Sequence, residues 1–175
     1  PIILSGNGAV RKRASNQLRR LAEKTGIRVV NTFMGKGAVS RHDPHCLYTI
    51  GLQGQDHVNA ALYAADVVIA VGYDLVEYSP KLWNKDTEKT IIHIDFWPAE
   101  IDEDYIVGVE VVSDVADALW QINELFDQEH KDKLPLYDIN NKQKLRTTIS
   151  DDFAMEKDDT SFPMKPQKVL WDIRE

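Results

Sequence analysis

The sequence predicts an α/β fold of the Rossmann-like kind, with three α/β/α layers built around a mostly parallel sheet of five to six strands. Short apolar runs alternate with amphipathic helical segments along residues 1–126, a pattern typical of βαβ units with right-handed crossovers. One of these runs, Val67–Val71, is apolar throughout and stops at Gly72. A continuously apolar strand indicates burial on both faces, which a parallel sheet covered by helices provides.

The first predicted unit is a strand, a helix and a second strand. Ile2–Leu4 is a short apolar run, and the segment Ala9–Lys24 after it predicts an amphipathic helix. Gly26 is expected to end this helix, and Ile27–Val30 supplies the next strand before a loop over residues 31–40. One helical stripe holds the apolar side chains Val10, Ala14, Leu18, Leu21 and Ala22.

The middle of the chain repeats the alternation with longer loops. A short strand is expected at Tyr48–Gly51, followed by a helix over Gln55–Ala65 and then by the buried strand. Turn residues and a proline make the segment 73–88 mostly loop. The last two predicted strands are Thr90–Ile94 and Val107–Val112.

The C-terminal part of the chain changes in character. Asp114 is placed to cap a helix that runs to about Phe126, which closes the predicted domain of residues 1–126. Residues 127–165 have the polar composition of a linker that contains some helix. From Pro166 to Glu175 the pattern predicts the start of another helix. We therefore expect a piece of a longer chain, which opens inside a strand and closes inside a helix.

Charge and composition exclude several classes of function. The 175 residues include 21 basic and 28 acidic side chains, a net charge of −7, and this acidity disfavours nucleic acid and anionic membrane as partners. The lone cysteine, Cys46, cannot form an internal disulfide and points to a reducing compartment. No apolar run is long enough for a membrane span, and no signal-peptide pattern is seen. A cytoplasmic location is expected.

Small, polar and glycine residues follow four of the predicted strands. In a doubly wound sheet, ligands bind beyond the carboxyl ends of the strands, so these four segments are the best physical pointer to a site. The segments are Ser5–Gly8, Asn31–Gly37, Gly72–Asp74 and Asp95–Pro98. The candidate cofactor-binding residues drawn from them are Gly6, Asn7, Gly8, Met34, Gly35, Lys36, Gly37, Gly72, Tyr73 and Asp95.

Two of these segments have competing interpretations. Gly6-Asn7-Gly8 resembles the opening of a dinucleotide fingerprint, but Arg11 stands at the third glycine and Asn31 where an acid is expected. A tight strand-to-helix turn is the alternative. In Met34–Ala38 a lysine lies between two glycines, which could bring backbone N–H groups and a cation to a phosphate or carboxylate. A surface turn explains that pattern equally well.

No catalytic residues and no metal ligands are predicted. The pair His42 and His45 has no second cluster to complete a zinc site. His93 lies inside a buried strand and is interpreted as a core residue, and Asp66 as a capping or turn residue. The acidic run 102–104 is expected to be a solvated loop.

Several motifs in order nevertheless resemble the central domain of thiamine-diphosphate-dependent enzymes, over about residues 1–126. The nearest branch is acetolactate synthase, and the stretch from Gly72 to Asn84 is similar to the catabolic α-acetolactate synthases. The motifs are Ser5-Gly6-Asn7-Gly8, Thr32 to Ala38, Gly51-Leu52-Gln53-Gly54, Ala65 to Gly72, Ile92-His93-Ile94-Asp95 and Val111 to Ala116.

The resemblance implies a parent enzyme of three domains that forms 2-acetolactate and CO₂ from two pyruvates with thiamine diphosphate and Mg²⁺. The family's catalytic Glu lies in its pyrimidine-binding domain, and its Gly-Asp-Gly…Asn motif lies in its diphosphate-binding domain. Neither is found in this sequence, so the chain alone is expected to be inactive. Lys165-Pro166-Gln167 resembles the entry into the diphosphate-binding domain, which makes 166–175 its start. The implied partners are these two domains and further copies of the parent, which forms homo-oligomers.

One departure from the family bears on a second cofactor. Biosynthetic relatives that contain FAD carry Gly-Ala-Arg-Phe-Asp-Asp-Arg where this chain has Gly72 to Tyr78, so that Asp74 and Tyr78 replace both arginines. FAD is therefore unlikely to be bound. The alternative is an FAD- or nucleotide-binding module of a related thiamine-diphosphate enzyme. Two interpretations are open for Tyr73, Tyr78 and Trp83. In the first they face the cleft. In the second they are packing residues, which fill the cleft or contact neighbouring domains.

Overall fold

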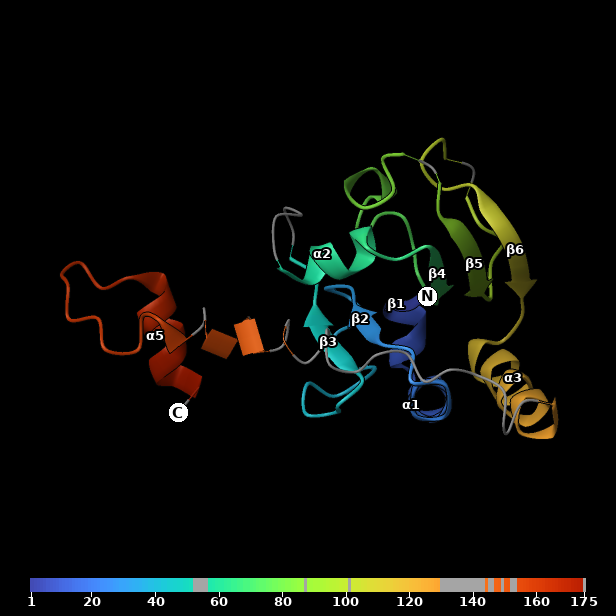
Figure 1. The fold of residues 1–175 in the computed structure, drawn as a ribbon, viewed down its shortest axis with the longest axis horizontal. Coiled ribbons are helices and arrows are strands. Elements are labelled where there is room, and N and C mark those ends of the chain that lie inside the picture. The colour runs from blue at the N-terminus through green and yellow to red at the C-terminus, as the bar shows by residue number, and fades with distance from the viewer. Residues whose placement is uncertain are drawn as a thin grey trace. The chain divides into compact units, whose positions relative to one another are not determined.

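A computed structural model confirms the α/β class. It describes residues 1–51, 57–86, 88–100, 102–129, 144, 147–148, 150–151 and 154–174. The sheet has six strands in the order β3-β2-β1-β4-β5-β6 (Figure 1). Their bounds are β1 Ile2–Ser5, β2 Val29–Asn31, β3 Cys46–Thr49, β4 Val67–Val71, β5 Thr90–Asp95 and β6 Val107–Val112.

All neighbouring strands are parallel, and the strand order reverses at β1. This strand pairs with β2 on one side, where Ile3 aligns with Val29, and with β4 on the other, where Ile3 aligns with Ile69. The reversal between β1 and β4 is the topological switch point of a doubly wound sheet. It opens a crevice at the carboxyl ends of the strands.

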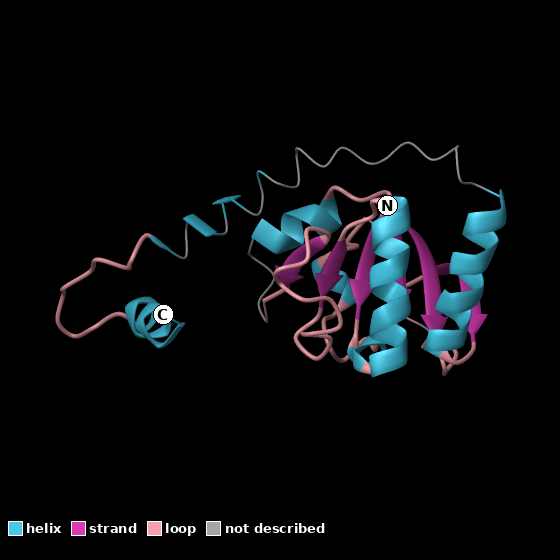
Figure 2. Cartoon of the chain, turned by 90° about the horizontal axis from the view of Figure 1, so that it is seen from below, coloured by secondary structure: helices cyan, strands magenta, loops and turns pink. Residues whose placement is uncertain are grey.

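Helices cover both faces of the sheet. Lys12–Thr25 forms α1 and Val115–Glu129 forms α3, and these two lie side by side on one face (Figure 2). The shorter α2, His57–Tyr63, lies on the opposite face. Two 3-10 turns, η1 Asn7–Val10 and η2 Pro80–Leu82, complete the part that positions the cleft.

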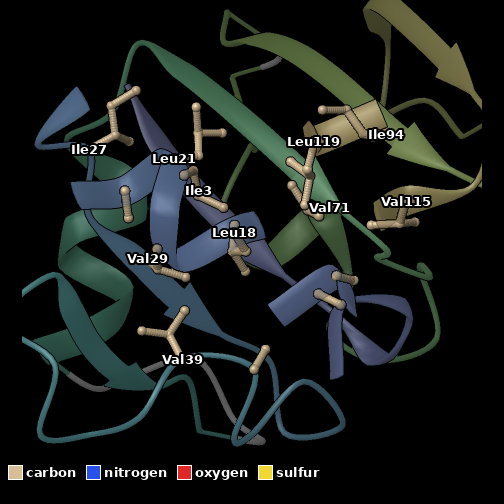
Figure 3. Packing of buried hydrophobic residues seen from close by; sticks show 14 of the residues in the cluster. Ile3, Leu18, Leu21, Ile27, Val29, Val39, Val71, Ile94, Val115 and Leu119 are labelled. Atoms are coloured by element: carbon tan, nitrogen blue, oxygen red, sulfur yellow. The ribbon is translucent and has the colours of Figure 1, made fainter. Parts of the chain in front are cut away.

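The face under α1 and α3 is aliphatic. Leu18 and Leu119 are fully buried there against Ile3 and Val71 of the sheet (Figure 3). Between the two helices, the buried Asn123 side chain donates to the backbone O and the Oε1 of Gln17, at 3.0 and 3.1 Å. The predicted helical stripe thus forms the core, except for Val10, which is 40% exposed.

Several predicted boundaries need correction. The second strand is Val29–Asn31 and not Ile27–Val30, α2 ends at Tyr63 and not at Ala65, and α3 runs to Glu129, past Phe126.

The first helix begins at Lys12 and not at Ala9, because Arg11 is extended and the preceding residues close a 3-10 turn. The third strand begins at Cys46, two residues earlier than predicted, since Cys46 and Leu47 are its buried members. The start of the helix predicted from Gln55 and most of the linker lie outside the described residues.

The predicted stop of α1 and the predicted cap of α3 are confirmed. Gly26 adopts φ 70° and donates to Ala22 O at 2.9 Å. Asp114 Oδ1 accepts from the N–H groups of Ala116 and Asp117, at 2.9 and 3.1 Å, which caps α3. The C-terminal helix α5 runs over Pro166–Arg174. It belongs to a second compact unit, Asp138–Glu175, separate from the unit Pro1–Tyr137.

A cluster of aromatic side chains is buried outside the aliphatic core. Trp83 is fully buried, with its ring centroid 6.3 Å from that of Tyr73 and 6.2 Å from that of Tyr105, both edge to face. His93 Nδ1 lies 2.9 Å from the Tyr105 hydroxyl. Burial raises the pKa of Tyr73 and of Tyr105 well above that of a free phenol.

Two turns at the switch point meet backbone against backbone. Gly8 N donates to Gly72 O at 2.8 Å, and Gly6 N donates to Val71 O at 2.9 Å. Gly72 has φ +57°, and a Cβ added to it would lie 2.5 Å from Ala9 N and from Gly8 Cα. Residue 72 therefore needs glycine both for its backbone conformation and for lack of space.

The first prediction concerns this contact. Gly72→Ala is expected to lower the free energy of unfolding by at least about 2 kcal/mol, because it adds a backbone clash to a strained φ. Gly108→Ala is the matched control, since a Cβ there meets nothing closer than 3.5 Å, and it should change stability by less than about 1 kcal/mol. Urea unfolding measures both, and equal losses would contradict the account of the turn.

The second prediction concerns the buried phenols. Since their folded pKa values exceed the unfolded value of about 10, the unfolded state loses these protons first as the pH rises. Stability should be fully present below about pH 10 and should fall above it, by about 1.4 kcal/mol per pH unit for each phenol. Urea unfolding at about pH 9 and about pH 11 tests this. Tyr105→Phe should remove the part of this pH-dependent loss of stability that Tyr105 contributes. Ionisation of all six tyrosines in the folded state would refute the prediction.

Candidate functional site

A cleft of about 1120 Å³ lies at the carboxyl ends of β1, β4 and β5, beside the N-termini of α1 and α3. This is the place where a doubly wound sheet binds its ligands. The predicted site residues that line it are Asn7, Gly8, Met34, Gly72 and Asp95. The other predicted residues are not part of its lining, namely Gly6, Gly35, Lys36, Gly37 and Tyr73.

The glycine turn after β1 has its backbone donors already engaged. Gly6 and Gly8 donate to carbonyl groups of the β4 turn, and Ala9 N donates to Gly6 O at 3.1 Å. Asn7 N donates to both carboxylate oxygens of Glu77, at 2.9 and 3.1 Å. A fingerprint turn uses such N–H groups to hold a phosphate. Here all four donors of residues 6–9 have acceptors within the chain.

Glu77 is the site residue that the sequence patterns missed. Besides the Asn7 N–H, its carboxylate accepts a hydrogen bond from the Thr32 hydroxyl and a long one, 3.4 Å, from Asp74 N. It therefore joins the loops that follow β1, β2 and β4. The available signal was weak: an acid five residues after Gly72, in a segment that otherwise reads as turn.

The turn after β2 packs against the backbone at the end of β1. Thr32 N donates to Ser5 O at 2.9 Å, and a Cβ on Gly35 would lie 2.1 Å from that same oxygen. Gly35 is therefore buried where two backbone segments of the chain approach closely. Lys36 and Gly37 are exposed and outside the cleft lining, an arrangement that favours the surface-turn interpretation of this motif.

Charge in the cleft is predominantly negative. Among the described residues that line it, two guanidinium groups, Arg11 and Arg13, face five carboxylates. The carboxylates serve local structure. Asp74 Oδ1 accepts from Val76 N at 3.0 Å, and Asp95 Oδ1 accepts from Trp97 N at 3.1 Å. Besides Glu77 and the cap Asp114, the remaining one is Asp117, which accepts from the Gln121 side chain at 2.8 Å.

Aromatic side chains form one rim of the cleft. Phe96 and Trp97 follow β5 and pack edge to face with centroids 5.2 Å apart. They are 56% and 71% exposed, and Trp120 of α3 is 47% exposed on the same lining. Rings exposed at this level offer flat apolar surface to a ligand or to a neighbouring protein segment.

Three other aromatic residues of this region do not line the cleft. Tyr73, Tyr78 and Trp83 are almost completely buried. The Tyr73 hydroxyl donates a short hydrogen bond to the backbone O of Tyr78, which closes the loop between them. None of the three lines the cleft, and the contacts that bury them are made inside this domain and not with a neighbouring one.

The two histidines that invited a metal-site interpretation remain without a cluster around them in the described part of the chain. Within the described ranges, no group of three or more His, Cys, Asp or Glu side chains could hold a metal ion. His45 Nδ1 instead lies 3.0 Å from Asp43 Oδ1. No helix among the described residues is both long and apolar enough to cross a membrane.

Comparison with known proteins gives a consistent result for the whole domain. Residues 1–122 match the family described as "Thiamine pyrophosphate enzyme, central domain". The chain is 29% identical over 184 residues to a "Probable acetolactate synthase large subunit" of Methanococcus aeolicus, covering 99% of this chain and 30% of the relative. It is 34% identical over 185 residues to the protein of that name from Methanocaldococcus jannaschii, covering 100% and 29%.

A third relative is similar over about two thirds of this chain. The "Acetolactate synthase" of Bacillus subtilis is 35% identical over 116 residues, covering 66% of this chain and 20% of the relative. The chain thus spans less than a third of the length of each of these relatives. With a family match over most of its length and the parallel sheet of a doubly wound domain, the chain belongs to the thiamine pyrophosphate enzyme central-domain family.

Proposed function

We propose that the chain is the central domain of an acetolactate synthase of the catabolic branch, and that its role there is structural and inter-domain. The observation that carries the proposal is the family match over residues 1–122, together with relatives named acetolactate synthase. The cleft supports it, because its carboxylates act as hydrogen-bond acceptors for nearby backbone and side-chain groups.

The parent enzyme would combine two pyruvates and a proton to give 2-acetolactate and CO₂. Thiamine diphosphate and Mg²⁺ would supply the carbanion chemistry, held by the pyrimidine-binding and diphosphate-binding domains of the same parent chain. Further copies of the parent would complete a homo-oligomer. Cys46 is a buried thiol that forms no disulfide, which supports a cytoplasmic location.

FAD does not fit the residues of this cleft. Asp74 stands where flavin-containing relatives have an arginine, and the other replacement, Tyr78, is buried. The glycine turn has no free N–H among residues 6–9 for a diphosphate. We therefore assign the parent to the branch that works without flavin.

A nucleotide-binding module is the second candidate function. It is favoured by the size of the cleft, by Arg11 and Arg13 on its wall and by the exposed rings of Phe96 and Trp97. A purified chain that carries flavin absorbance, or that is stabilised by FAD or ADP in thermal unfolding, would support this candidate over the first.

The third prediction tests the domain assignment. The purified chain, given pyruvate, thiamine diphosphate and Mg²⁺, should form no 2-acetolactate above a protein-free blank, because the groups that handle pyruvate lie in other domains. The readout is acetoin, measured colorimetrically after acid decarboxylation of the product. The full-length Bacillus subtilis relative, assayed in parallel, is the positive control. Thiamine-dependent product formation by the chain alone would overturn the assignment.

A further inference from the structure

We infer that the cleft at the switch point is a binding site for flat organic cations, meaning molecules that join an aromatic ring to an ammonium or guanidinium group. The exposed rings of Phe96, Trp97 and Trp120 hold the flat part of the ligand, and carboxylates beside them hold its charge. The inference concerns the cleft of this chain, and it does not depend on which reaction the parent catalyses.

The first step is the arrangement of the rings. Phe96 and Trp97 come from the loop after β5 and Trp120 comes from α3, yet all three line one cleft and are about half exposed or more. The planes of Phe96 and Trp97 are at 89°, so these two rings form a corner and do not stack face to face. Rings that gather in a cleft and stay exposed offer a ligand surfaces on which to stack.

The second step is that each of these indoles has a carboxylate beside it. Asp95 Oδ1 accepts from Trp97 N at 3.1 Å, which holds this carboxylate next to the corner. Asp117 precedes Trp120 by three residues on α3, so their side chains are neighbours on the helix surface. Asp117 Oδ2 accepts from the Gln121 side chain at 2.8 Å. Among the described residues, the other oxygen of each carboxylate has no hydrogen-bond partner.

The third step is a further carboxylate in the loop after β4. Asp74 is exposed, and its Oδ1 accepts from Val76 N at 3.0 Å, which leaves Oδ2 open to a ligand. The Val76 side chain is 86% exposed and adds apolar surface to the same lining. Glu77 takes no part, because its oxygens accept from Asn7 N and from the Thr32 hydroxyl.

The fourth step is that charge decides between a cation and an anion of the same shape. The described lining holds five carboxylates and two guanidinium groups, so its formal charge is −3. A cation over the face of an indole is attracted by the ring as well as by the carboxylates. Arg11 and Arg13, both exposed at the start of α1, do not reverse this balance.

The fifth step is size. The cleft volume of about 1120 Å³ lies slightly above the range of about 300 to 1,000 Å³ that is usual for small-molecule sites. An inorganic cation would leave the rings uncovered. In the part of the chain that the structure describes, no group of three His, Cys, Asp or Glu side chains is arranged to hold one. The cation that fits is therefore an organic one.

The fourth prediction compares two probes of opposite charge. Tryptamine and indole-3-acetate share one indole ring and carry an ammonium and a carboxylate group. The chain should bind tryptamine at least about tenfold more tightly, because the ring contacts are the same and only the cation is attracted by the carboxylates. The preference should shrink as salt is raised. Titrations followed by ¹H–¹⁵N NMR at low and at high salt measure both affinities.

The indole N–H signals in the same spectra locate the site. The chain has four tryptophans, of which Trp97 and Trp120 line the cleft. Their two signals should shift when tryptamine is added. The signals of the buried Trp83 and of Trp171, which belongs to the second compact unit, are the internal controls and should stay unchanged.

Ring variants test the stacking surface. Trp97→Ala should weaken tryptamine binding at least about fivefold, since it removes a stacking face and its attraction for the cation. Phe33→Ala is the matched control, because Phe33 is a comparably exposed ring outside the lining, and it should leave the affinity unchanged. Trp120→Leu, on a different element, is the second ring variant in case Trp97→Ala does not fold.

A charge variant tests the carboxylates. Asp95→Asn keeps an oxygen for Trp97 N and loses the negative charge, so it should reduce the preference for tryptamine over indole-3-acetate. Glu100→Gln is the matched control, since Glu100 is an exposed acid outside the lining, and it should keep the preference.

Four outcomes would overturn the inference. The chain could bind the two probes equally well. ADP, a flat anionic ligand, could bind more tightly than tryptamine. The control variants could lose as much as the variants in the lining. Tryptamine could also bind without shifting the signals of Trp97 and Trp120. None of these readouts involves 2-acetolactate, so they separate from a failure of the proposed function.

Discussion

Two turns meet without side chains between them where the sheet reverses at β1 and β4, and the rest of the site depends on that contact. Gly8 and Gly72 lie so close that a Cβ on either would clash with the other's backbone. This approach uses the N–H groups of the first turn internally. It also brings the loop after β4 next to the turn after β1, so that the Glu77 carboxylate accepts from Asn7 N.

Two buried groups of side chains serve this arrangement differently. The aliphatic face under α1 and α3 supplies much of the buried apolar surface and fixes the helices whose N-termini border the cleft. The aromatic cluster of Tyr73, Trp83 and Tyr105 holds the loop after β4. A hydrogen bond from His93 Nε2 to Trp97 O, 3.3 Å long, connects this cluster to the rim of the cleft. The neutral tautomer that donates from Nε2 can accept from Tyr105 at Nδ1.

A family fold and a ligand site are separable in this domain. The doubly wound sheet provides the crevice through its topology alone, whatever side chains line it. What the crevice admits is decided by a few groups on its loops. Here a carboxylate stands at the glycine turn, five carboxylates face two arginines and three rings border the opening. The fold of a doubly wound domain is thus combined with a lining in which carboxylates outnumber arginines.

Local patterns in the sequence were sufficient for the strands, the long helices and the edge of the sheet that carries the cleft. Apolar period, capping residues and glycine stops are short-range properties, and Gly26, Asp114 and Val67–Val71 behave as their neighbours in sequence predict. Five of the ten candidate residues line the cleft for the same reason, since they follow strands whose ends must meet.

The extended Arg11 and the position of Glu77 arise from contacts between segments far apart in sequence. Arg11 breaks the first helix because the turn before it packs on Gly72. Glu77 reaches Asn7, 70 residues away, because the strand order places β4 beside β1. Lys36, which looked suited to an anion from its flanking glycines, lies on the surface because Gly35 is drawn against Ser5. The hydrophobic periodicity of a sequence carries no information about such long-range backbone packing. The contact between Glu77 and Asn7 was therefore decided by the tertiary structure alone.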